Sequence, residues 1–330
     1  MTRTTRSEQT VAGAASWAAA ELAAAGCVSP WAEARWLLEE ALGTPLPGRG
    51  PQPLPAGAVQ RLEAMVARRA GGEPLQYVVG WAPFGPLRLR VGPGVFVPRP
   101  ETEGLAERAA VHLRAAGQRP LAVDLCTGCG AIACFLAAEV PGARVVATEL
   151  DPQPLAWAQA NTAVHGIELL AGDLDGPLPA ELAGRVDVLC ANVPYVPTGA
   201  IATLPRDVRD REPRLALDGG PDGLDVLRRV VARAGHWLAP GGWLVCEIGD
   251  DQGGAAVRLL ASAGLTEVAA RPDLAGSDRV IEGRWRGPGR RGPGNPEGRR
   301  GPGNPRGVPR SVGPRSLGPG GVPRSTGGEA

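Results

Sequence analysis

The 330-residue chain contains no lysine, so all 35 of its basic side chains are arginines. This absence excludes chemistry that depends on a lysine amine, such as a Walker A phosphate clamp or a Schiff base. Histidine is scarce as well: the 3 histidines, His112, His165 and His236, are too far apart to suggest a histidine-rich zinc site. No uncharged apolar run reaches the ~18 residues that a membrane-spanning helix needs. We therefore expect neither a metal centre nor a membrane span.

The charge of the chain is low overall but unevenly distributed. The formal net charge is +1, and the 43% of hydrophobic residues is typical of a soluble protein with a packed core. Residues 287–330 hold eight arginines against two glutamates and are rich in glycine and proline, which leaves the remainder mildly acidic. This composition predicts a disordered tail. The tail either makes weak contact with RNA or the ribosome or is a solvated extension without a partner.

Cysteine usage and the N-terminal residues bear on the compartment. The chain has 6 cysteines, most of them inside apolar runs, as buried thiols in a reducing compartment would be. The alanine-rich N-terminal stretch carries Glu8 and Glu21 and makes a poor signal peptide. We therefore expect a cytoplasmic protein.

Hydrophobic spacing divides the chain into a helical part, a hairpin and an alternating part. Helical periodicity over 7–72 predicts a small helical domain, residues 1–74. In 75–100, Tyr77–Val79 and Leu87–Val91 are predicted strands of a β-hairpin linker. Strands and helices then alternate over 101–286, which predicts a doubly wound, Rossmann-like α/β sheet with its ligand at the carboxyl ends of the strands. The expected strands are 121–125, 144–149, 167–171, 186–191, 242–248, 265–271 and 279–285.

A loop from Asp124 to Gly130 follows the first of these strands and opens a helix. Glycines in this place let the backbone approach a ligand closely. Glu149 ends the next strand, where its carboxylate can accept hydrogen bonds from both hydroxyls of a ribose. Gly128, Gly130 and Ala133 also satisfy the dinucleotide fingerprint G-x-G-x-x-A. The carboxylate of Asp124 suits a cationic ligand such as S-adenosylmethionine better than a pyrophosphate.

A second motif, Asn192-Val193-Pro194-Tyr195, directly follows the predicted strand 186–191. The Asn192 side chain can accept a hydrogen bond from an amide NH2 group, and the proline-stiffened turn offers the carbonyl of Val193 as a second acceptor. Two acceptors on one NH2 group would hold its nitrogen in line with a methyl donor. Tyr195 offers a flat face for a planar amide or a base.

Further motifs surround these two. They are Glu73-Pro74-Leu75-Gln76-Tyr77, Phe96-Val97-Pro98-Arg99-Pro100-Glu101-Thr102-Glu103, Glu212-Pro213, Gly219-Gly220-Pro221-Asp222-Gly223-Leu224-Asp225, Pro240-Gly241-Gly242 and Glu247-Ile248-Gly249. With the loop and the tetrapeptide, they make the chain resemble the protein-(glutamine-N5) methyltransferases, the HemK/PrmC-like release-factor methyltransferases, over about 73–285.

The resemblance implies a fold, a function and a set of site residues. The fold is a seven-stranded class I methyltransferase sheet behind an N-terminal helical domain that helps to hold a protein substrate. The function is S-adenosylmethionine-dependent methylation of a glutamine amide nitrogen in a release factor or another translation protein, such as a ribosomal protein, without a metal. By motif, the methionine part of the cofactor lies on Cys126, Thr127, Gly128, Cys129 and Gly130, its ribose on Glu149, and its adenine near Asp173 and Leu174, while Asn192, Val193, Pro194 and Tyr195 bind the glutamine amide. Asp124 and Asn192 are also expected to contribute to cofactor binding.

Three residues depart from the family pattern. Val193 stands where the family usually has proline, Cys126 where it has the first loop glycine, and Cys129 where it has serine or threonine. Cys126 and Cys129 form a C-x-x-C motif, but no second such motif completes a zinc site, and a redox role stays open. Arg99 is interpreted either as a positioning group near the cofactor or as an ion-pair partner of Glu101 or Glu103.

Two alternative functions differ in class. The first is methylation of adenine N6 in a nucleic acid, whose target NH2 group is chemically alike. A flipped base needs a basic channel, which the acidic remainder of the chain does not favour. The second is a cofactor-binding module without activity.

Overall fold

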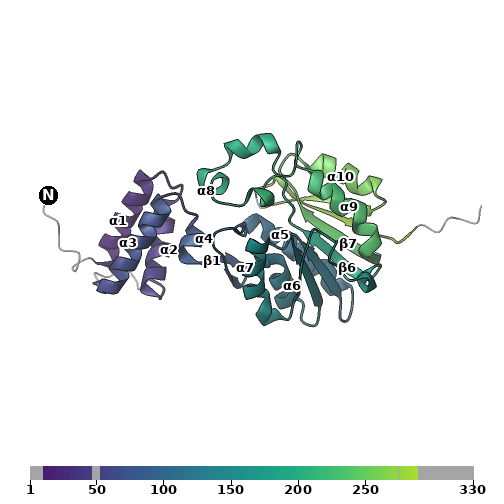
Figure 1. Ribbon diagram of the computed structural model, residues 1–330, viewed down its shortest axis with the longest axis horizontal. Helices are drawn as coiled ribbons and strands as arrows, with labels where there is room; N and C mark the ends of the chain where they lie inside the picture. Colours follow the sequence, from purple (N-terminus) through teal and green to yellow (C-terminus); the bar gives the residue numbers. More distant parts are fainter. Residues whose placement is uncertain (1–9, 47–52, 274, 289–330) are drawn as a thin grey trace, which may run out of the picture. The chain divides into compact units, whose positions relative to one another are not determined.

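In the computed structural model, three helices at the N-terminal end of the chain form a bundle (Figure 1). The structure describes residues 10–46, 53–273 and 275–288. Helices α1 (Val11–Ala24), α2 (Pro30–Leu42) and α3 (Ala56–Ala70) surround an apolar core of their own. Proline is at the first position of α2, where a helix needs no backbone N–H donor. Most of the predicted tail, 289–330, lies outside the described residues.

The segment after the bundle corrects one prediction. Tyr77–Val79, predicted as a strand, belongs to the short helix α4 (Leu75–Val79), which ends at Gly80 with a φ of 83°. The strand preference of the valines is overridden by packing: Leu75 and Val78 share one helix face and contribute to the core of the bundle. The hairpin itself pairs β1 (Trp81–Phe84) with β2 (Leu87–Arg90).

A seven-stranded sheet lies at the centre of the part of the chain that follows the hairpin, with the strand order β5-β4-β3-β6-β7-β9-β8. Its strands are β3 (Leu121–Leu125), β4 (Arg144–Glu149), β5 (Glu168–Ala171), β6 (Val186–Ala191), β7 (Leu238–Glu247), β8 (Thr266–Pro272) and β9 (Asp278–Arg284). The first five are parallel, while β9 is antiparallel to β7 and β8. The strand order reverses between β3 and β6, which is where doubly wound sheets bind ligands. All seven strands agree with the predicted set to within a few residues at their ends.

Helices cover both faces of this sheet (Figure 1). One apolar core contains α5 (Pro100–Ala115) and α6 (Ala131–Glu139), with Trp157 of α7 (Pro152–Thr162) packed against it. The other contains α9 (Asp225–Trp237) and α10 (Gly253–Ser262). The hairpin packs into the α5–α6 core, where Phe84 and Phe135 meet edge to face with 5.9 Å between ring centroids. Short elements η2 (Ala163–His165), η3 (Ala180–Leu182), η4 (Thr198–Thr203), α8 (Arg206–Arg209) and η5 (Arg214–Ala216) lie in the connections.

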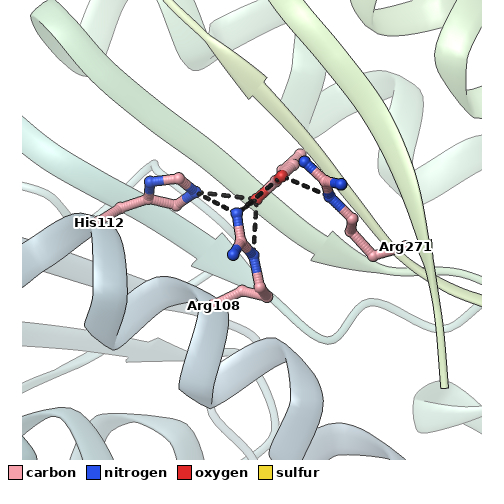
Figure 2. A network of polar contacts seen from close by, with 4 residues as sticks. Arg108, His112 and Arg271 are labelled. Atoms are coloured by element: carbon pink, nitrogen blue, oxygen red, sulfur yellow. Dashed lines mark hydrogen bonds and ion pairs between the residues drawn. The ribbon is translucent and has the colours of Figure 1, made fainter. Parts of the chain in front are cut away.

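A buried carboxylate ties α5 to the antiparallel strands (Figure 2). Glu282 of β9 accepts hydrogen bonds from Arg108 at 2.9 Å and from Arg271 at 2.8 Å, and His112 Nε2 lies 2.8 Å from it. The His112 ring also stacks on Trp243 at 3.9 Å. Burial acts to raise the pKa of Glu282, but the hydrogen bonds from His112, Arg271 and Arg108 outweigh it and hold the pKa at about 2. This cluster stabilises the antiparallel side of the sheet.

Within the described residues, none of the helices combines the length and the apolar composition needed to cross a membrane.

Candidate functional site

A pocket lies at the carboxyl ends of β3, β4, β5 and β6, where the reversal of strand order predicts one. It holds about 1210 Å³ of empty space, part of which is open to solvent. Its wall includes most of the residues predicted to bind the cofactor or the acceptor: Cys126, Thr127, Gly128, Cys129, Glu149, Asp173, Leu174, Asn192, Pro194 and Tyr195. Asp124, Gly130 and Val193 are not part of the wall.

Asp124 is completely buried behind the loop that follows β3. Its carboxylate accepts hydrogen bonds from the Thr127 hydroxyl at 2.6 Å and from the backbone N–H of Ala133 at 3.2 Å. Burial raises its pKa to about 7, because removal from water disfavours the charged form. Asp124 therefore holds the loop against the start of α6 rather than facing the pocket.

The backbone of the loop has a positive φ, the conformation that favours glycine, at Cys126 as well as at Gly128 and Gly130. Gly128 has a φ of 58°, and a Cβ atom there would meet nothing within 4 Å, so the backbone is open toward a ligand. Cys126 has a φ of 57°, in the left-handed region that costs an L-residue about 1–2 kcal/mol. Burial raises the pKa of the Cys129 thiol to about 12 and that of Cys126 as well, so neither is an activated thiol.

Glu149 ends β4 beside this loop. One carboxylate oxygen accepts from the backbone N–H of Gly128 and the other from that of Asp151, each at 2.9 Å. Each oxygen keeps a further lone pair for a ligand. Burial raises the pKa of Glu149, while these backbone hydrogen bonds act to lower it. The side chain is thus fixed in the wall as a hydrogen-bond acceptor.

Arg229 is the one cation in the pocket wall among the described residues, and it pairs with Asp173 at 2.6 Å. The next residue, Leu174, is buried with a φ of 48°. The wall suits a ligand with ribose hydroxyls and an apolar ring, because Glu149 supplies acceptors and Ile132, Leu174 and Val226 supply apolar surface. The residues therefore fit the adenosine part of S-adenosylmethionine.

The Asn192–Tyr195 turn begins directly after β6. The Asn192 Nδ2 group donates to the Thr102 hydroxyl at 3.2 Å. Among the described residues, neither the Asn192 Oδ1 atom nor the carbonyl oxygen of Val193 accepts a hydrogen bond. The turn therefore carries two acceptors that no internal donor satisfies. The other asparagine of the described residues, Asn161, is structural: its Nδ2 group donates to the carbonyls of Cys129 at 2.9 Å and Arg90 at 3.0 Å.

The segment Gly219–Asp225 packs directly on this turn. A Cβ atom on Gly219 would lie 2.6 Å from the carbonyl oxygen of Pro194, and one on Gly223 would overlap that of Tyr195. Gln252 also donates to the Tyr195 carbonyl at 2.9 Å. The glycines of this motif are thus required by the close approach of two backbones.

Arg99 has a partner that the sequence does not reveal. It pairs with Glu212, at 2.6 Å, rather than with Glu101 or Glu103, and it is not part of the pocket wall. Glu212 is buried, which raises its pKa to about 7 against the opposing effect of Arg99. The pair connects the start of α5 to the segment before η5. The two residues are far apart in the sequence, so spacing alone does not indicate that they pair.

Sequence reasoning names Thr102 and Glu247 only as members of the family motifs and assigns neither of them to the site. Thr102 is a buried part of the pocket wall. Glu247 is completely buried at the end of β7, and neither of its oxygens has a hydrogen-bond partner among the described residues. One signal in the sequence could have found it: an acidic residue interrupts the apolar run Trp243–Ile248.

The strand order and the pocket at the carboxyl ends of the parallel strands define the class I methyltransferase fold. The family model described as PrmC N-terminal domain matches residues 14–80. The release factor glutamine methyltransferase of Mycolicibacterium smegmatis is 44% identical over 276 residues, which are 80% of this chain and 94% of that protein. That of Geobacter sulfurreducens is 38% identical over 273 residues, 81% of this chain and 94% of that protein. The chain belongs to the release factor glutamine methyltransferase family.

A solved structure is also similar to the chain. The crystal structure of a protein-(glutamine-N5) methyltransferase (release factor-specific) from Alicyclobacillus acidocaldarius is 29% identical, covers 61% of this chain and 100% of that one, and has a TM-score of 0.38.

Proposed function

We propose that this protein methylates a glutamine side-chain amide nitrogen in a peptide chain release factor, with S-adenosylmethionine as the methyl donor. The observation that carries the proposal is the pair of unsatisfied acceptors, Asn192 Oδ1 and the Val193 carbonyl oxygen, in a turn that borders the pocket. The family membership supports the choice of substrate.

The cofactor is assigned to the wall formed by the loop after β3 and the ends of β4 and β5. Cys126 to Gly130 would hold its methionine part, with Asp124 fixing the loop from behind. Glu149 would accept hydrogen bonds from the ribose hydroxyls, and Asp173 and Leu174 would border the adenine. When bound, S-adenosylmethionine supplies an electrophilic methyl group on its sulfonium.

The chain's own residues then orient the acceptor. An amide nitrogen is a poor nucleophile because its lone pair is delocalised. Asn192 Oδ1 and the Val193 carbonyl oxygen would accept hydrogen bonds from its two N–H groups and so fix the nitrogen in line with the methyl group. Pro194 would stiffen the turn, and Tyr195 would lie against the plane of the amide. Proximity and orientation of this kind are worth up to about 7–11 kcal/mol.

Recognition of the release factor is assigned to the helical domain, residues 1–74, and methyl transfer to 101–286, with 75–100 joining them. In support, the bundle has its own core, and Arg69 of α3 contacts Asp207 of α8 at 3.4 Å, close to the segment that borders the pocket. A weak contact of the 287–330 tail with RNA or the ribosome stays a prediction, because most of the tail lies outside the described residues. A cytoplasmic location stays a prediction as well.

The test is methyl transfer from labelled S-adenosylmethionine to a purified release factor, with the site mapped by mass spectrometry. We expect one methylated glutamine, and a loss of about 100-fold in turnover for Asn192→Ala, by analogy with the removal of one preorganised polar contact. Val193→Pro, which keeps the carbonyl, should preserve turnover, and Asn295→Ala in the tail is the matched control. Label on a DNA or RNA substrate instead, or wild-type turnover of Asn192→Ala, would contradict the proposal.

A further inference from the structure

A buried carboxylate without a partner lies next to the acceptor-binding turn. Glu247 ends β7, and in the parallel pairing of β6 with β7 its neighbour Cys246 lies opposite Ala191, so Glu247 comes level with Asn192. Its side chain is 0% exposed, and both of its oxygens lack a hydrogen bond among the described residues. An unpaired carboxylate costs several kcal/mol in such a place, so a buried acid here calls for an explanation.

The groups around Glu247 are hydroxyls and one cation. Burial raises its pKa, while the hydroxyls of Thr102 and Tyr195 and the charge of Arg279 lower it. The exposed carboxylate of Glu101 acts in the opposite direction and raises the pKa of Glu247. Thr102 and Tyr195 both border the pocket, and Thr102 is the residue to which Asn192 donates. Glu247 therefore faces two side chains of the site without facing the pocket itself.

The polarity of Asn192 depends on this arrangement. The two ends of an asparagine side chain have nearly the same shape, but only Oδ1 can accept a hydrogen bond from a substrate NH2 group. A threonine hydroxyl can donate or accept, so Thr102 alone does not choose between the two orientations. Glu247 accepts only when it is ionised, the form that the charge of Arg279 favours. If the Thr102 hydrogen is directed to Glu247, the Thr102 oxygen can only accept from Nδ2 of Asn192, and Oδ1 is left toward the substrate.

We propose that Glu247 is a positioning residue for methyl transfer, which acts through the Thr102 hydroxyl to keep Asn192 Oδ1 toward the acceptor amide. The proposal rests on the proposed function, in which Asn192 binds the glutamine amide. Glu247 touches neither substrate nor cofactor. Its contribution is to remove the alternative in which the NH2 group of Asn192 meets the NH2 group of the substrate.

The test compares Glu247→Gln, Thr102→Val and Thr102→Ser in single-turnover methyl transfer at saturating cofactor. Glu247→Gln and Thr102→Val should each lower the rate by about 10- to 100-fold, as is typical when the partner of a functional side chain is removed. Thr102→Ser keeps the hydroxyl and should restore the rate to within about threefold of wild type. The double variant should be no slower than the slower single variant, because both changes break one chain of hydrogen bonds.

Two measurements separate positioning from a structural role. The Kd for S-adenosylmethionine should stay within about twofold of wild type in all three variants, since none of these residues carries the cofactor. Thr148→Val removes another buried hydroxyl, one without a partner among the described residues, and Glu282→Gln removes a buried carboxylate that is not part of the pocket wall. Both controls should keep the wild-type rate at a temperature where they are folded.

The outcomes are distinguishable from those of the proposed function. Wild-type rates in Glu247→Gln and Thr102→Val, with Asn192→Ala inactive, would overturn this inference and leave the proposed function intact. A rate loss in Thr102→Val without a near-wild-type rate in Thr102→Ser would also overturn this inference. If Glu247→Gln does not fold, the comparison of these two Thr102 variants tests the inference instead. Absence of glutamine methylation by the wild-type protein would overturn both.

Discussion

The α-carbon of Gly219 lies so close to Pro194 that an added Cβ atom would stand 2.6 Å from the Pro194 carbonyl oxygen. The same atom would also stand 2.6 Å from the carbonyl oxygen of Gly223. Both neighbours are backbone, which cannot move aside as a flexible side chain can. The position of the acceptor-binding turn therefore depends on a glycine outside it.

Gly219→Ala should displace the turn. We expect a loss of about 1–3 kcal/mol in unfolding free energy from overpacking, together with a turnover loss larger than the change in cofactor Kd. Gly199→Ala is the matched control, because it lies in η4 of the same region, is exposed and has nothing within 4 Å of its Cβ position. Urea unfolding and the methyl-transfer assay measure both. Equal behaviour of the two variants would show that the segment does not support the turn.

Glu149→Gln should weaken the binding of S-adenosylmethionine. The substitution keeps the shape but removes the charge and one acceptor, and a hydrogen bond to a charged group is worth about 1.5–3 kcal/mol, which is about 10- to 100-fold in Kd. Glu168→Gln is the control, because Glu168 begins β5 at the opposite end of the sheet and pairs with Arg144 near the surface. Calorimetry gives both values. Unchanged affinity would remove the assignment of the ribose to Glu149, and tight NADH binding by the wild type would contradict the choice of cofactor.

The parts of the fold that could be predicted are those governed by local pattern. Alternating apolar strands and helices give the sheet, and strand ends locate the loop after β3, Glu149 and the Asn192–Tyr195 turn. The helix α4 could not be predicted in this way, because its valines favour a strand and only packing of Leu75 and Val78 into the bundle decides otherwise.

The site residues show the same limit. Asp124 lies behind its loop and not in the pocket wall. This placement depends on the direction of one strand side chain, which the sequence does not specify. The Arg99–Glu212 pair and the place of Glu247 beside Thr102 join residues more than a hundred positions apart. Such contacts are set by tertiary packing, so spacing rules that work within one helix or strand do not reach them.

Cys126→Gly should be more stable than Cys126→Ala. Both substitutions remove the thiol and its apolar contacts, but alanine retains the strain of a φ of 57° and glycine does not. We expect the glycine variant to have an unfolding free energy about 1 kcal/mol higher than the alanine variant. At most positions alanine is the more stable of the two, because glycine leaves the unfolded chain more conformational freedom. Urea unfolding of the two variants measures it. A more stable alanine variant would show that the backbone at Cys126 relaxes without cost.

The Glu282 cluster should make stability depend on acid pH. The pKa of Glu282 is held at about 2 in the folded protein, below its ordinary value of 4.5, by His112, Arg271 and Arg108 (Figure 2). The unfolded chain therefore takes up this proton first as the pH falls. The stabilisation, of about 3 kcal/mol, is fully present above about pH 5 and is lost progressively toward pH 2. Glu282→Gln cannot titrate and should lack this part of the slope.

The measurement is urea unfolding of wild type and Glu282→Gln at a series of pH values from acid to neutral. Other carboxylates titrate in both proteins, so the quantity to follow is the difference in unfolding free energy between them. We expect it to be largest near neutral pH and to shrink as the solution is acidified. Glu168→Gln, which removes an exposed partner of Arg144, should give a small and nearly constant difference. A difference for Glu282→Gln that does not change with pH would contradict the assignment of its low pKa.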